Sequence, residues 1–152
     1  MAAFLNAARA FAFVCLLAAP AAAQERDAIE LTALSPQPLE PGRCGLFLWS
    51  RSEQPAFVFV AYDQPAEARV RAGERSLSLP RTDFSGERQS GHFEHQTFSD
   101  GRLTLAVDLR FDPERQIRSG TVVESGVIRV RNREGWETVV PVGGMVACQA
   151  RA

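Results

Sequence analysis

Apolar and polar residues alternate along most of the chain that follows residue 44. In RLTLAVDLRF, residues 102–111, every second residue is apolar, and the residues between them are mostly polar or small. This two-residue period is that of a β-strand with one face buried and the other in water. Similar runs recur at even spacing, with turn residues between them, and no segment keeps a helical period for three turns. The pattern therefore predicts an all-β domain.

The turns between these runs favour antiparallel neighbours. Ala72-Gly73-Glu74 and Asn132-Arg133-Glu134-Gly135 are short connections of the kind that join hairpins. We expect a small antiparallel β-barrel or sandwich of about eight strands. The strongest expected strands are CGLFLWS (44–50), PAFVFVAY (55–62), AEARVRA (66–72), RSLSL (75–79), RLTLAVDLRF (102–111), GVIRVRN (126–132), WETVVPV (136–142) and MVAC (145–148).

The first 23 residues have the order of a secretory signal peptide. Arg9 is followed by the apolar run Ala10–Ala19, then by Pro20, and the small residues Ala21 and Ala23 precede the expected cleavage point. The apolar run is shorter than the roughly 20 residues that span a bilayer, so we expect no stable membrane insertion. The sequence predicts a periplasmic or secreted protein.

The remaining chain has the size of one domain. Residues 24–43 contain AIELTAL (28–34), expected as a short edge strand, and then the proline-rich SPQPLEPG (35–42), expected as a linker. Residues 44–152 are expected to form the β domain.

The cysteines indicate how this domain is closed. Cys15 leaves with the signal peptide, and Cys44 and Cys148 remain as a pair in an oxidising compartment. Neither has a histidine or another cysteine at metal-ligand spacing, so we expect a disulfide and no metal. Closing a loop of about 100 residues is worth about 4–5 kcal/mol in the chain-entropy model.

The charge balance limits the partners. The whole chain has 17 basic residues, all of them arginine, and 18 acidic residues. A nucleic-acid-binding domain usually carries a strongly basic face, so we expect no nucleic-acid partner. The lack of lysine excludes every lysine-based mechanism.

No catalytic or cofactor motif is present. The sequence contains no G-x-S-x-G elbow, P-loop, GxGxxG or haem CxxCH. His92 and His95 are three residues apart in a predicted strand, and their side chains should therefore point to opposite faces and cannot share a metal. We expect a non-enzymatic binding protein without a cofactor.

Part of the chain resembles the periplasmic and membrane-bound inhibitors of C-type lysozyme. The matching segments are Cys44, AEARVRAGERSLSL (66–79), DFSGERQ (83–89) and the closing Cys148-Gln149. The resemblance implies a small antiparallel β-barrel with a disulfide from its first strand to the end of the chain. Beyond Asp108 the sequence is similar instead to exported small β-domain proteins of α-proteobacteria.

In the inhibitor family, the serine of a Ser-Gly-x-Arg loop and a lysine of the next turn enter the lysozyme cleft and pair with its catalytic carboxylates. The resemblance assigns that serine to Ser85, the glycine to Gly86 and the arginine to Arg88. The segment TFSDG places Asp100 where the family has its lysine.

Our leading hypothesis is a domain that binds an envelope or extracellular protein, with C-type lysozyme as a candidate partner. Its contact surface is expected in the loop Asp83–Gly91 and the residue that follows it. The candidate contact residues are Ser85, Gly86, Arg88 and His92.

Two alternatives remain open. The first is a barrel that binds a small apolar ligand, with an aromatic lining of Phe47, Trp49, Phe57, Phe59 and Trp136. The second is a structural accessory of an envelope assembly, which would pair through an exposed edge such as AIELTAL.

Overall fold

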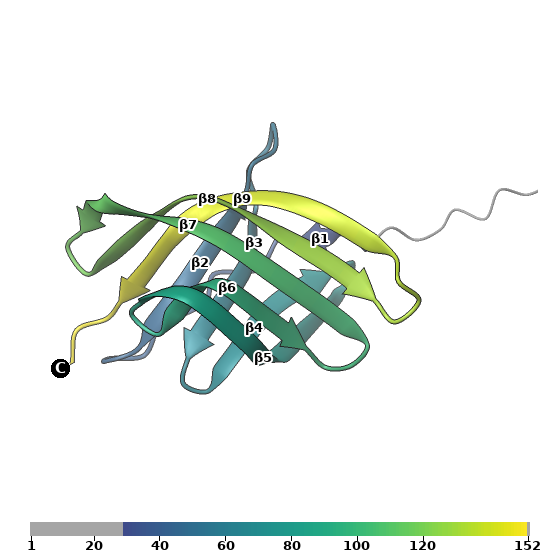
Figure 1. Ribbon diagram of the computed structural model, residues 1–152, viewed down its shortest axis with the longest axis horizontal. Coiled ribbons are helices and arrows are strands. Elements are labelled where there is room, and N and C mark those ends of the chain that lie inside the picture. Colours follow the sequence, from purple (N-terminus) through teal and green to yellow (C-terminus); the bar gives the residue numbers. More distant parts are fainter. Residues whose placement is uncertain (1–28, 152) are drawn as a thin grey trace, which may run out of the picture.

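The computed structural model describes residues 29–151, except for the side chain of Gln116. This part of the chain is built from nine β-strands (Figure 1), which confirms the predicted all-β class. In the same range no helix has the length and apolar character needed to cross a membrane. The predicted signal peptide lies outside the described residues.

The strands follow one another through short turns. They are β1 (Leu31–Thr32), β2 (Cys44–Ser50), β3 (Phe57–Asp63), β4 (Ala66–Ala72), β5 (Arg75–Gln89), β6 (His92–Ser99), β7 (Leu103–Ile117), β8 (Gly120–Asn132) and β9 (Glu137–Cys148).

Strands β2 to β9 close into one antiparallel barrel. Their order is β4-β3-β2-β9-β8-β7-β6-β5, and the pairing of β4 with β5 closes the ring. Of the two architectures that the sequence left open, the barrel is therefore the observed one. The short strand β1 pairs with β4 through Leu31 and Thr32, beyond the point where the pairing with β3 ends.

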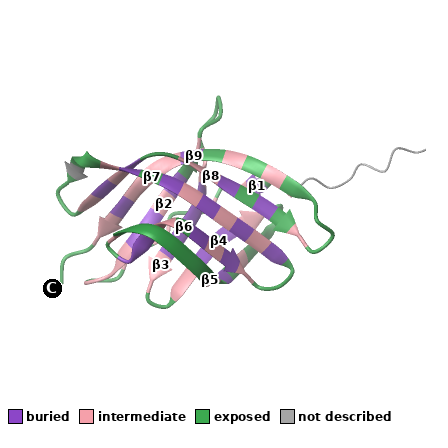
Figure 2. Ribbon diagram, viewed as in Figure 1, coloured by how far each residue is buried: buried purple, intermediate pink, exposed green. Residues whose placement is uncertain are grey.

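The predicted apolar stripe of β7 is the side that faces the barrel interior. Buried and less buried residues alternate along residues 103–112 of this strand (Figure 2). Each fully buried aliphatic or aromatic side chain contributes about 1.5–3 kcal/mol. In the same core, the Phe59 and Phe98 rings meet edge to face, with their centroids 5.6 Å apart. The buried stripe consists of Leu103, Leu105, Val107, Leu109 and Phe111.

The disulfide joins Cys44 and Cys148, as predicted. It lies at the end of the barrel where β2 begins and β9 ends. The β3–β4 turn after Asp63 and the β5–β6 turn at Ser90-Gly91 belong to the same end, because neighbouring strands are antiparallel. We call this the disulfide end of the barrel.

The segment between β1 and β2 packs on the outside of the barrel. The Leu34 amide donates a hydrogen bond to the Phe57 carbonyl oxygen at 2.7 Å. A Cβ atom on Gly45 would lie 3.4 Å from Leu39 Cδ1. The proline-rich segment therefore covers part of β2 and β3.

Candidate binding hairpin

Strands β5 and β6 form the hairpin that contains the predicted contact residues. The segment expected as a loop is mostly the second half of β5, and only Ser90 and Gly91 form the turn. Both turn residues have positive φ, 47° and 88°. Ser85 and Arg88 are exposed, and they lie opposite His95 and Phe93 of β6. The hairpin is thus a paired ribbon rather than a free loop.

Gly86 lies where the β5–β6 register shifts, between Ser85 and Arg88. Its φ is +84°, and a Cβ atom there would lie 2.7 Å from Glu94 Oε2. The same oxygen accepts a hydrogen bond from the Glu87 amide at 3.0 Å. A glycine is therefore required for this bulge, both by its backbone conformation and by the nearby Glu94.

Phe84 is a surface feature of the hairpin that the sequence analysis did not identify. The residue is 53% exposed, although its ring lies against the Phe93 ring, with centroids 4.4 Å apart and the two ring planes tilted by 33°. The Arg81 guanidinium lies 5.1 Å from the Phe84 ring and 5.2 Å from the Phe93 ring. Arg81 Nη1 also donates hydrogen bonds to Gly91 O and Gln96 Oε1, both at 2.9 Å. Arg81 therefore fixes an exposed aromatic ring to the hairpin.

Partial burial strengthens this arrangement. Desolvation is the main cause that lowers the pKa of Arg81 from its usual value, with a smaller contribution from the nearby Arg88 charge. Cation–π contacts are stronger when the cation is partly removed from water. The Arg81 contacts should therefore hold Phe84 more firmly than an exposed pair would.

The prediction that His92 belongs to the contact surface is wrong. The residue is 0% exposed and lies directly opposite Gln89, next to the hairpin turn. His95 is 56% exposed in its side chain, so the two histidines do lie in different environments, as alternation predicted. Within residues 29–151, no three His, Cys, Asp or Glu side chains gather as a metal-binding group.

His92 belongs to a buried polar cluster at the disulfide end. Neither of its ring nitrogens has a hydrogen-bond partner among the described atoms, and the same holds for Gln96 Nε2 and Asp63 Oδ1. Asp63 Oδ1 lies 3.7 Å from Arg43 Nε. Burial lowers the pKa of His92 to about 4. The nearby Asp63 charge raises this pKa, but its effect is smaller than that of burial. His92 is therefore neutral at physiological pH.

The predicted aromatic lining of the barrel is also wrong for most of its members. Phe59 is fully buried in the core, but Trp49 and Trp136 are 36% and 47% exposed. Phe47 stacks with Phe57 at a centroid distance of 6.2 Å, and the Trp49 ring is tilted against Phe57 at 5.2 Å. Phe47 and Trp49 of β2 alternate with the buried Leu46 and Leu48. The register of β2 and β3 shifts between Leu48 and Trp49, and this shift places Phe57 opposite Trp49. The hypothesis of an apolar ligand inside the barrel loses the lining on which it depended.

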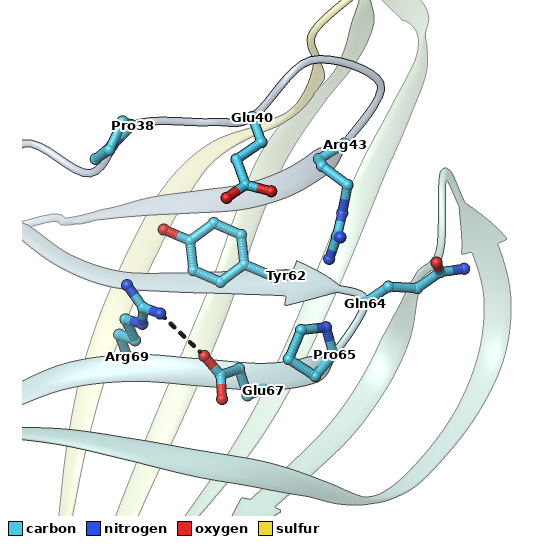
Figure 3. A pocket seen from close by; sticks show the side chains of 8 residues that line it. All are labelled: Pro38, Glu40, Arg43, Tyr62, Gln64, Pro65, Glu67 and Arg69. Atoms are coloured by element: carbon cyan, nitrogen blue, oxygen red, sulfur yellow. Dashed lines mark hydrogen bonds and ion pairs between the residues drawn. The ribbon is translucent and has the colours of Figure 1, made fainter. Parts of the chain in front are cut away.

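A recess of about 210 Å³ lies outside the barrel, between the segment before β2 and the β3–β4 hairpin (Figure 3). The Tyr62 ring lies in it, with the Arg69 guanidinium 5.1 Å from the ring centroid. Burial raises the pKa of Tyr62, so its hydroxyl stays protonated. Arg69 pairs with Glu67 at 3.2 Å, so these two charges of the recess are matched within it. The lining residues are Pro38, Glu40, Arg43, Tyr62, Gln64, Pro65, Glu67 and Arg69.

Asp100, which stands where the inhibitor family has a lysine, closes the β6–β7 turn. Its Oδ1 accepts hydrogen bonds from the Arg102 and Leu103 amides at 2.8 and 2.9 Å. These bonds lower the pKa of the Asp100 carboxyl. The β6–β7 turn and the β5–β6 turn lie at opposite ends of β6. Asp100 follows His95 by five residues, which corresponds to about 16 Å along an extended strand. The structure does not bring Asp100 together with Ser85 and Arg88.

Comparisons of the chain with protein-family models, with curated proteins and with solved structures found no match.

Proposed function

We propose that this chain is an exported protein-binding domain and that it binds its partner through the β5–β6 hairpin. The observation that supports this best is the fixed and exposed ring of Phe84. The residue is more than half exposed, yet its ring is held by Phe93 and Arg81. An aromatic side chain in this setting is a typical anchor of a protein interface.

The rigidity of the hairpin favours binding. A side chain that is ordered before binding loses less conformational entropy when the partner covers it, and this loss is about 0.5–1.5 kcal/mol for a mobile side chain. Phe84, Phe93 and Arg81 are already ordered by one another, and the hydrogen bond from the Glu87 amide to Glu94 holds the adjacent bulge. The hairpin therefore presents Phe84 and Arg88 without prior rearrangement.

We propose a C-type lysozyme as the partner. The cleft of such a lysozyme contains two carboxyl groups, which favour a cationic ligand. Arg88 is an exposed cation next to the Ser85-Gly86 bulge. Asp100 lies at the other end of β6, so its charge does not oppose the approach of Arg88 to carboxylates. Arg88 would take the part that the lysine has in the inhibitor family.

The test is a lysis assay with a C-type lysozyme and the protein without residues 1–23. We expect micromolar protein to slow lysis, and Phe84→Ala and Arg88→Ala each to weaken the effect at least about tenfold, equivalent to about 1.4 kcal/mol of binding. Val139→Ala is the matched control, because Val139 is also 53% exposed but lies on β9. Unchanged lysis with the parent protein would reject the lysozyme proposal, and equal effects of Phe84→Ala and Val139→Ala would reject the hairpin.

A further inference from the structure

A serine, a histidine and an aspartate lie side by side on three neighbouring strands. Ser85 of β5 is directly opposite His95 of β6, and His95 is directly opposite Asp108 of β7. Directly opposed residues of antiparallel strands project to the same face of a sheet, with Cβ atoms about 4.5–5.5 Å apart. The three side chains therefore form one row across the hairpin and its neighbour.

Asp108 orients the His95 ring. His95 Nδ1 lies 2.8 Å from Asp108 Oδ1, and the Arg129 guanidinium binds the other carboxylate oxygen, Oδ2. The hydrogen bond with His95 is the main cause that lowers the pKa of Asp108, and Arg129 adds to it. The charged carboxylate favours the tautomer with the proton on Nδ1, which leaves Nε2 as a proton acceptor.

The opposite edge of the ring faces β5. A Cβ atom on Gly86 would lie 3.2 Å from His95 Cδ2. Nε2 is bonded to Cδ2 and therefore lies on the half of the ring that is away from Asp108. Ser85 is exposed and directly opposite His95, so its hydroxyl has room to change its χ1 rotamer on the same face of the sheet. The order serine, imidazole, carboxylate is that of a nucleophile, its general base and the group that orients the base.

We propose that Ser85, His95 and Asp108 form an acyl-transfer site that hydrolyses carboxylic esters with small acyl groups. Ser85 Oγ attacks the ester carbonyl carbon while its proton moves to His95 Nε2. The carbon–oxygen bond to the alcohol breaks, and the alcohol leaves with that proton. Water then attacks the acyl-serine with His95 as the base, releases the carboxylic acid and restores the Ser85 hydroxyl. Asp108 acts as a positioning residue throughout.

This site differs in two ways from an ordinary surface ion pair. The carboxylate is held by both His95 and Arg129, and a glycine is required at the position next to the serine. An ion pair between His95 and Asp108 requires neither a serine directly opposite the histidine nor a residue without a Cβ atom beside the imidazole ring. The side chains of His95 and Asp108 are 56% and 38% exposed, so an ester can reach them without entering a pocket.

The test uses the protein without residues 1–23, p-nitrophenyl acetate as substrate and a fluorophosphonate as a covalent probe. We expect the probe to modify Ser85, as located by mass spectrometry, and Ser85→Ala to abolish both modification and turnover. His95→Gln should lower the labelling rate at least about 10²-fold, which is the usual size of general-base catalysis. Ser78→Ala changes another exposed serine of β5 and should have no effect.

Asp108→Asn separates a positioning role from a merely structural one. We expect it to lower kcat at least about tenfold with little change in KM, because the orientation of the base is lost while the surface that meets the ester remains. Labelling of Ser85 at the same rate in the parent and in His95→Gln would overturn the proposal, as would the absence of any adduct on Ser85. The readouts need no protein partner, so their outcome is independent of lysozyme binding.

Discussion

Cys44 and Cys148 face each other across the β2–β9 ladder, with their Cα atoms 4.0 Å apart and their sulfur atoms bonded. The bond links the first strand of the barrel to the last, over a sequence separation of 104 residues. We expect Cys44→Ala with Cys148→Ala to lower the free energy of unfolding by about 2–5 kcal/mol. Urea unfolding followed by tryptophan fluorescence measures this. If the midpoint and slope of the urea unfolding curve were unchanged, the hydrogen bonds between β2 and β9 alone would hold these two strands together.

His92 should make the protein less stable in mild acid. Its pKa is about 4 in the folded protein and 6.5 in the unfolded chain, so the unfolded chain binds the proton first as the pH falls. The contribution of neutral His92 to the free energy of unfolding is therefore fully present above pH 6.5. About 3 kcal/mol of it is lost as the pH falls from 6.5 to 4. Urea unfolding at several pH values measures the loss.

His92→Leu provides the control for this pH effect. The substitution removes a buried imidazole whose nitrogens lack a well-formed hydrogen bond, and a buried polar group without a partner costs about 1–3 kcal/mol. We expect the variant to be at least as stable as the parent at pH 8 and to lose the change in stability between pH 6.5 and pH 4. A variant with the same pH dependence as the parent would assign that dependence to other groups.

Gly144 and Gly143 should respond very differently to an added methyl group. A Cβ atom on Gly144 would lie 2.0 Å from the Phe47 carbonyl oxygen, which the ladder holds in place. At Gly143 the nearest atom, at 2.8 Å, is Nε of the flexible Arg51 side chain. We expect Gly144→Ala to cost about 3 kcal/mol or more and Gly143→Ala to stay within about 1 kcal/mol of the parent. Equal thermal midpoints for the two variants would contradict the close approach of β2 and β9.

Phe98 and Phe84 should separate stability from function. Phe98 is fully buried against Phe59, so Phe98→Ala should cost about 3–5 kcal/mol. Phe84 is 53% exposed, and Phe84→Ala should cost only about 1 kcal/mol, which is the scale of its contact with Phe93. Chemical denaturation of the two variants measures both costs. A large loss from Phe84→Ala would mean that the ring serves the fold rather than a partner.

The sequence was sufficient for the fold class and for much of the strand pattern. The alternation in residues 102–111 predicted the buried side of β7, and Gly73 and Gly135 marked two of the turns. Alternation is a local property, so it can be seen without knowledge of neighbouring strands. The same holds for the disulfide, since Cys44 and Cys148 were the only cysteines outside the predicted signal peptide.

The surface features depended on information that the sequence does not contain. The alternation of side chains along a strand places His92 and His95 on opposite faces, but it does not show which of the two faces the barrel interior. The row of Ser85, His95 and Asp108 arises from the register of β5, β6 and β7, which includes two shifts in the β5–β6 ladder. Bulges of this kind are set by the packing of the closed barrel. For the same reason, Phe47, Trp49 and Phe57 were assigned to the wrong side, while Phe59 was placed correctly.

The most direct test of the proposed function is a map of the lysozyme contact. Isotope-labelled protein without residues 1–23 would be titrated with a C-type lysozyme, and its amide chemical shifts would be followed by NMR. Binding through the hairpin predicts that the largest changes cluster within residues 81–93. Changes confined to other strands, or none at saturating lysozyme, would contradict it.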